Sequence, residues 1–121
     1  MRKSILILVA LLIAPLAIAD QCQPFTGGLG YARYLPTTAK KLTDAPTAGV
    51  SLPAGTTGAV IFVNVAPIRY RTDGTNPTAS EGVQVPAGTS LVFRAADASQ
   101  LSVFAFIEAS SGAEVTVAYC H

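Results

Sequence analysis

Residues 59–74 read "AVIFVNVAPIRYRTDG", and this stretch predicts two β-strands separated by a proline. Valine, isoleucine, phenylalanine and tyrosine dominate both runs, and such residues favour strands over helices. Pro67 interrupts the pattern because proline cannot donate to a sheet. Asp73-Gly74 then supplies a turn signal. The segment therefore indicates short strands joined by tight connections.

The rest of the chain repeats this pattern, with short apolar runs separated by Pro-Ala-Gly, Asn-Pro and Ser-Gly. No stretch after residue 19 holds a helical period, and the best candidate, 95–100, is too short. Seven or eight short strands at this spacing predict an all-β fold, a small antiparallel, jelly-roll-like β-sandwich. The expected strands are 31–35, 50–52, 59–66, 68–72, 82–85, 90–95, 101–108 and 114–119.

The N-terminus has the three parts of a secretory signal peptide. Two positive charges in "MRKS" precede an apolar run, and Ala17-Ile18-Ala19 gives the small-x-small pattern of a cleavage site. The apolar stretch over residues 5–19 is shorter than the roughly 20 residues that a membrane-spanning helix needs. We therefore expect a helical signal peptide over 1–19, cut before Asp20, and a single domain over 20–121. A retained anchor is the alternative. The expected location is the periplasm or the outside of the cell.

The two cysteines, Cys22 and Cys120, lie at opposite ends of the expected mature chain. Because exported proteins meet an oxidising compartment, we expect the pair to form a disulfide. Closing a loop of about 100 residues would contribute about 4–5 kcal/mol in the chain-entropy description. A bridge between two chains is the alternative.

The charges and motifs argue against several classes of protein. Without Arg2 and Lys3 the chain carries 6 basic and 7 acidic residues, with no clustered basic face of the kind that nucleic acids require. The single histidine is terminal, so no catalytic triad can be assembled with it. No metal or cofactor motif occurs. We expect a non-enzymatic protein with no catalytic residue, no metal, no cofactor and no nucleic-acid partner.

The polar stretch "IRYRTDGTNPTASEG" (68–82) is the candidate binding region. Strand alternation places Ile68 and Tyr70 inward and Arg69 and Arg71 outward. The competing interpretation is a loop that bonds its own backbone, with Arg71 paired to Asp73 or Glu81. The possible binding or interface residues are Arg69, Arg71, Asp73, Asn76 and Glu81.

Two strands are apolar on both faces. In 59–65, alternation places one apolar group on each face of the strand: Ile61, Val63 and Val65 on one, Val60 and Phe62 on the other. In 102–108 the two faces carry Val103, Ala105 and Ile107 on one side and Phe104 and Phe106 on the other. Each sheet of a sandwich has one inward face, so the second apolar face needs a cover. A loop and another subunit are both consistent with this pattern.

Residues 69–82 follow the pattern R-Y-R-x-D-G-x-x-P-T-x-x-x-G. An Ala-Gly turn, a Phe-Ile element and a final V-x-Y strand come after it. This combination resembles a small family of bacteriophage and prophage virion proteins. The matching residues are Arg69, Tyr70, Arg71, Asp73, Gly74, Pro77, Thr78, Gly82, Ala87, Gly88, Phe106, Ile107, Val117 and Tyr119. The resemblance covers roughly residues 40–120. It implies a compact β domain in a head or tail particle, as a decorating or adaptor subunit. It implies no activity and no substrate.

Together these observations predict an exported structural or interaction module that associates with itself or with a protein partner, and a virion association is compatible with it. The alternative is an envelope or extracellular domain that binds a surface glycan or a protein through residues 72–82. No stable membrane insertion is expected after cleavage of the signal peptide.

The disulfide prediction can be tested by calorimetry of the monomeric mature chain. Reduction should lower the melting temperature by several degrees, because it returns conformational freedom to the unfolded chain. The Cys22→Ser/Cys120→Ser double variant should not respond to reductant. An unchanged melting temperature on reduction would show that the cysteines do not pair within one chain.

Overall fold

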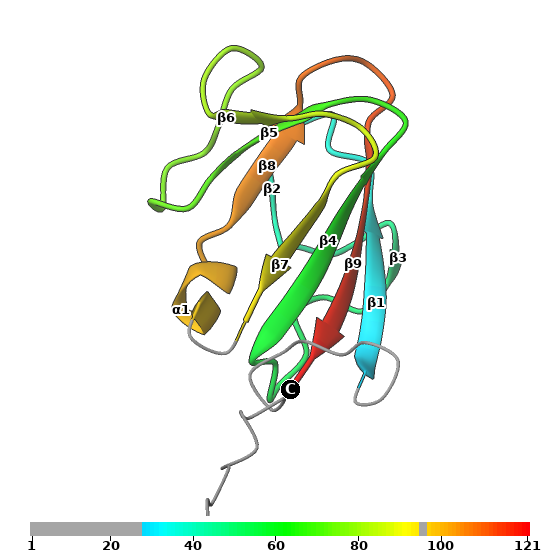
Figure 1. Cartoon of the computed structure of the whole chain (residues 1–121), viewed down its shortest axis with the longest axis vertical. Coiled ribbons are helices and arrows are strands. Elements are labelled where there is room, and N and C mark those ends of the chain that lie inside the picture. The colour runs from blue at the N-terminus through cyan, green and yellow to red at the C-terminus, as the bar shows by residue number, and fades with distance from the viewer. Residues whose placement is uncertain (1–27, 95–96) are drawn as a thin grey trace, which may run out of the picture.

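The computed structural model describes residues 28–94 and 97–121 and shows two antiparallel sheets packed as two layers (Figure 1). The strands are Gly28–Tyr34 (β1), Lys40–Lys41 (β2), Ala48–Gly49 (β3), Gly58–Asn64 (β4), Ile68–Arg71 (β5), Val83–Val85 (β6), Ser90–Phe93 (β7), Ala105–Glu108 (β8) and Glu114–Cys120 (β9). One helical turn, Ala98–Leu101 (α1), precedes β8. The all-β sandwich prediction is confirmed.

The strand order also confirms the jelly-roll prediction. The five-stranded sheet runs β3-β1-β9-β4-β7, and the four-stranded sheet runs β2-β8-β5-β6. Without the two-residue β3, the eight remaining strands are divided four and four between the sheets, in the double Greek-key order of a jelly roll. The last strand, β9, lies between β1 and β4; it pairs with β4 over its whole length and with β1 from Val115 to Cys120.

The core lies between the layers and is built by strand alternation. On β9 the side chains of Val115, Val117 and Tyr119 point inward and are fully buried. Facing them, Phe104 touches three aromatic rings, those of Tyr70, Phe93 and Phe106, at centroid distances of 5.2–5.6 Å. Burying each such side chain contributes about 1.5–3 kcal/mol. Further core residues are Ala32, Tyr34, Leu42, Ala59, Ile61, Val63, Ile68, Val85 and Leu101.

Two tyrosines supply a polar contact inside this core. The Tyr34 hydroxyl donates to the Leu42 carbonyl at 3.0 Å, and it lies 3.4 Å from the Tyr119 hydroxyl. Since Tyr34 uses its proton on Leu42, Tyr119 is the donor between the two hydroxyls. Burial raises the pKa of both phenols, because the ionised form would lose its hydration. The hydrogen bond to Tyr34 raises the pKa of Tyr119 further.

Two of the expected strands are wrong. Residues 50–52 form no strand, because the amide of Val50 bonds Tyr31 while that of Leu52 bonds Leu42, in a different part of the fold. The pairing with β1 comes instead from β3, at 48–49. The strand expected over 101–108 begins only at Ala105, since Leu101 ends α1 and is buried at the edge of the core.

Sequence reasoning also missed β2 and misplaced one side chain. Lys40 and Lys41 pair with Phe106 and Ala105 at a sheet edge, although nothing apolar marks them as a strand. Val65 was expected on the face of Ile61 and Val63, but β4 ends at Asn64. Val65 has a φ of 70° and is 76% exposed. The amide of Ala66 bonds the Asn64 carbonyl at 2.8 Å, which forms a γ-turn centred on Val65.

Two expectations fall on residues outside the described ranges: the signal peptide over 1–19 and the cysteine Cys22. The strand expected over 90–95 is shorter than predicted and ends at Phe93. Within 28–94 and 97–121, no helix has the length and apolar character to cross a membrane.

The buried tyrosine pair predicts alkaline destabilisation. Both folded-state pKa values are raised, so stability is fully present below the unfolded pKa of about 10 and is lost as the pH rises above it. Urea midpoints measured between pH 8 and 11 should fall with pH, and Tyr119→Phe should flatten that fall. Tyr31→Phe, which changes an exposed tyrosine, should leave the pH dependence as in wild type. A pH-independent midpoint in wild type would refute the prediction.

Candidate functional site

Arg69 anchors the loop that follows β5. Its side chain points away from the core, as predicted, while Ile68 beside it is buried. The guanidinium donates to two main-chain carbonyls, from Nε to Ala79 at 2.9 Å and from Nη1 to Gly82 at 3.2 Å. Charge-assisted bonds of this kind are stronger than neutral ones. Arg69 therefore fixes the returning half of the 72–82 loop against the strand.

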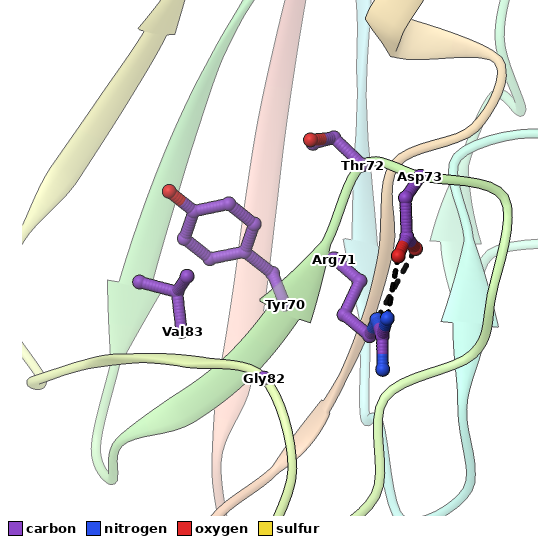
Figure 2. A pocket seen from close by; sticks show the side chains of 6 residues that line it. All are labelled: Tyr70, Arg71, Thr72, Asp73, Gly82 and Val83. Carbon is purple, nitrogen blue, oxygen red and sulfur yellow. Dashed lines mark hydrogen bonds and ion pairs between the residues drawn. The ribbon is translucent and has the colours of Figure 1, made fainter.

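Arg71 is paired within the loop. It donates from Nε and Nη2 to the two carboxylate oxygens of Asp73, at 3.1 and 2.5 Å, in the fork geometry that suits a carboxylate (Figure 2). The pair raises the pKa of Arg71 and holds the pKa of Asp73 below its usual range. Of the two partners that the sequence left open for Arg71, the structure selects Asp73.

The remaining polar groups of the 72–82 loop bond their own backbone. Asp73 accepts from the Thr75 amide at 3.1 Å, which is an Asx turn. The Thr78 hydroxyl accepts from the amides of Ser80 and Glu81 at 3.3 and 2.9 Å. The side chains of Asn76 and Glu81 are exposed and hydrogen-bond to no described residue. Of the five predicted binding residues, only Arg71 and Asp73 hydrogen-bond to each other, while Glu81 acts on Arg71 through its charge.

This loop covers one of the two apolar outer faces. The outward side of the four-stranded sheet carries Arg69 and Ile107, which lie opposite each other on β5 and β8. Ala79 of the loop and Ile107 line the same shallow hollow of about 160 Å³. The loop therefore lies next to Ile107 and shields it in part, since Ile107 is half-buried. Phe104 and Phe106, which the alternation places on one face, both point into the core.

The outward side of the five-stranded sheet is different. In register across four neighbouring strands lie Val92, Val60, Ala118 and Tyr31, and Phe62 follows Val60 on the same side of β4. We call these five residues the open face. Tyr31 is 61% exposed, Val92 52% and Phe62 37%, whereas Val60 in the middle is buried. Such a contiguous apolar group is typical of an interaction surface.

The open face ends in a polar strip. Arg33 on β1 donates to Glu114 on β9 at 2.7 Å, and Asn64 on β4 lies opposite Glu114. The strip therefore carries one positive and one negative charge, joined to each other. Sequence reasoning found Val60 and Phe62 but missed Tyr31 and Val92. Each has an apolar side chain in an alternating strand, and only the pairing of β1 and β7 with the central strands brings them to one surface.

Cys120 is the last residue of β9. It is buried, and its neighbours in register on both sides are glycines, Gly28 on β1 and Gly58 on β4. Glycines leave the space beside the sulfur free of cross-strand side chains, which suits a disulfide on this side of the sheet. The expected partner, Cys22, lies outside the described residues, so the bridge stays a prediction.

Neither metals nor relatives add a further assignment. In the part of the chain that the structure describes, no three His, Cys, Asp or Glu side chains gather where a metal ion would bind. A scan against protein-family models and searches of curated proteins and of solved structures found no match to this chain.

The anchoring role of Arg69 predicts a local defect in its alanine variant. Arg69→Ala should lower the free energy of unfolding by about 1–2 kcal/mol, because two charge-assisted hydrogen bonds are lost. Amide exchange should accelerate at Ala79–Gly82 and Ile107. The control is Arg94→Ala, since the Arg94 side chain makes no hydrogen bond or ion pair with the described residues. Unchanged exchange in the loop of Arg69→Ala would contradict the anchor.

Proposed function

We propose that this chain is a non-enzymatic, exported structural module that associates with a second copy of itself through the open face. The observation that carries the proposal is the exposure of Tyr31, Phe62 and Val92 on one side of the five-stranded sheet. A β-sheet whose second face is apolar buries that face against another layer. The four-stranded sheet has its own loop as that layer, and the five-stranded sheet leaves three large side chains exposed.

A second copy suits this surface because the surface is complementary to itself. The apolar row is flanked by Arg33 and Glu114, so a twofold rotation can set each charge of one copy near the opposite charge of the other. Two sheets of this kind pack face to face with their strands within about 30° of each other. The face carries no excess of either charge, so it offers nothing specific to a strongly charged partner.

The alternative, a glycan or protein site on the 72–82 loop, has less support. The guanidinium groups of Arg69 and Arg71 are held by the loop's own carbonyls and by Asp73. A ligand that used these groups would first have to break intramolecular bonds, and it would lose that free energy from its affinity. Of the five predicted binding residues, Asn76 and Glu81 are the ones whose side chains hydrogen-bond to no described residue.

The virion resemblance fits the proposal without deciding it. Jelly rolls with this strand arrangement occur in viral capsid and lectin domains, and fold by itself does not determine function. A decorating or adaptor subunit needs stable contacts between copies, which the open face would supply. Export, with a disulfide between Cys22 and Cys120, belongs to the same proposal.

Light scattering after size-exclusion chromatography tests the self-association of the chain from residue 20. The wild-type mass should rise above that of one chain as the loading increases. Val92→Lys should stay monomeric, because it places a charge in the middle of the interface. Val83→Lys is the matched control: Val83 is 56% exposed, close to the 52% of Val92, but belongs to the other sheet. A wild type that stays monomeric at every loading would overturn the proposal.

A further inference from the structure

A hollow at the end of β5 and the start of β6 is separate from the open face. It has a volume of about 340 Å³ and is lined by Tyr70, Arg71, Thr72, Asp73, Gly82 and Val83 (Figure 2). Tyr70 and Val83 lie opposite each other in the β5–β6 pair, at the edge of the four-stranded sheet. The hollow is near the lower end of the range for small-molecule sites, about 300–1,000 Å³.

Tyr70 provides an aromatic platform in this hollow. Its ring stacks on Phe104 with centroids 5.2 Å apart and planes at 23°, so one face is held by the core. Figure 2 looks onto the face of the ring, with Val83 beside it. Val83 is 56% exposed. The side chain is thus fixed in position by the aromatic core, while part of it reaches the surface.

The polar groups of the hollow are hydroxyls and a closed ion pair. The Tyr70 and Thr72 hydroxyls point to the same side of β5 in Figure 2, and neither hydrogen-bonds to any described residue. Arg71 and Asp73 neutralise each other through two hydrogen bonds. The site therefore offers two hydroxyl groups next to an apolar ring, and no uncompensated charge to attract an anion or a cation.

We propose that this hollow binds one neutral pyranose ring of a glycan. The apolar C–H face of a sugar ring would pack against Tyr70 and Val83, and its hydroxyls would exchange hydrogen bonds with Tyr70 and Thr72. A small apolar surface with a few convergent polar groups is the common design of ligand sites. This function is additional to self-association. It does not use Arg69, and of the 72–82 loop it uses only the two ends, Thr72-Asp73 and Gly82.

The test is an NMR titration of the chain from residue 20 with the methyl glycosides of glucose, galactose, mannose and N-acetylglucosamine. At least one should shift the signals of Tyr70, Thr72 and Val83 in a saturable way. Tyr70→Phe keeps the ring on Phe104 and removes the hydroxyl, so it should weaken binding about 3- to 10-fold. Tyr31→Phe removes an exposed hydroxyl from the open face and should leave the affinity unchanged.

Three results would overturn the inference: no saturable shift with any of the four sugars, shifts confined to other surfaces, or an equal loss in Tyr70→Phe and Tyr31→Phe. A heptapeptide of alternating valine and threonine tests the main rival, strand addition at the β6 edge. Shifts of the β6 amides with this peptide, without any response to sugar, would assign the site to a peptide instead. Val92→Lys separates the two proposals, because it should abolish self-association and leave sugar binding intact.

Discussion

The position of β9 between β1 and β4 is the constraint on which the rest of the molecule depends. All seven residues of β9 pair with β4 and six of them also pair with β1. The inward side chains of Val115, Val117 and Tyr119 line one side of the core. The same strand carries Ala118 and Glu114 on its other side, and so contributes to the open face. The interior and the outer surface of the five-stranded sheet are thus set by one alternating segment, and a change of register by one residue would exchange them.

The two sheets solve the problem of a second apolar face in different ways. The four-stranded sheet is covered by the 72–82 loop, which Arg69 fastens through main-chain carbonyls. The five-stranded sheet leaves Tyr31 and Val92 exposed. This asymmetry is the main support for the proposed self-association. It also explains why the most polar part of the sequence serves the fold and the least polar surface is the better candidate for contact with a partner.

Much of the architecture can be predicted from the sequence because strand alternation is a local property. The inward positions of Ile61, Ile68 and Phe106 follow from period-two patterns in short β-branched runs, and so do the outward arginines of β5. Long-range pairing is not local. Lys40 and Lys41 become a strand only because β8 lies beside them. Val65 leaves its expected face because a γ-turn ends β4 at Asn64, two residues before the expected end of the strand at 66. The open face joins residues from strands far apart in the chain, so no single stretch of sequence marks it. The Tyr70 hollow lies within residues 70–83, but it forms only because the chain returns to pair β6 with β5.

The anchoring of the 72–82 loop by Arg69 determines which substitutions the loop can accept. Both acceptors of its guanidinium are backbone carbonyls, so the anchor does not depend on which side chains the loop carries at 74–81. Substitutions there leave the attachment to the sheet in place, provided that the returning backbone keeps its path. The loop is therefore a position at which new sequences can be tried, by evolution or by an experimenter who wishes to display a peptide, while the sandwich beneath it stays the same.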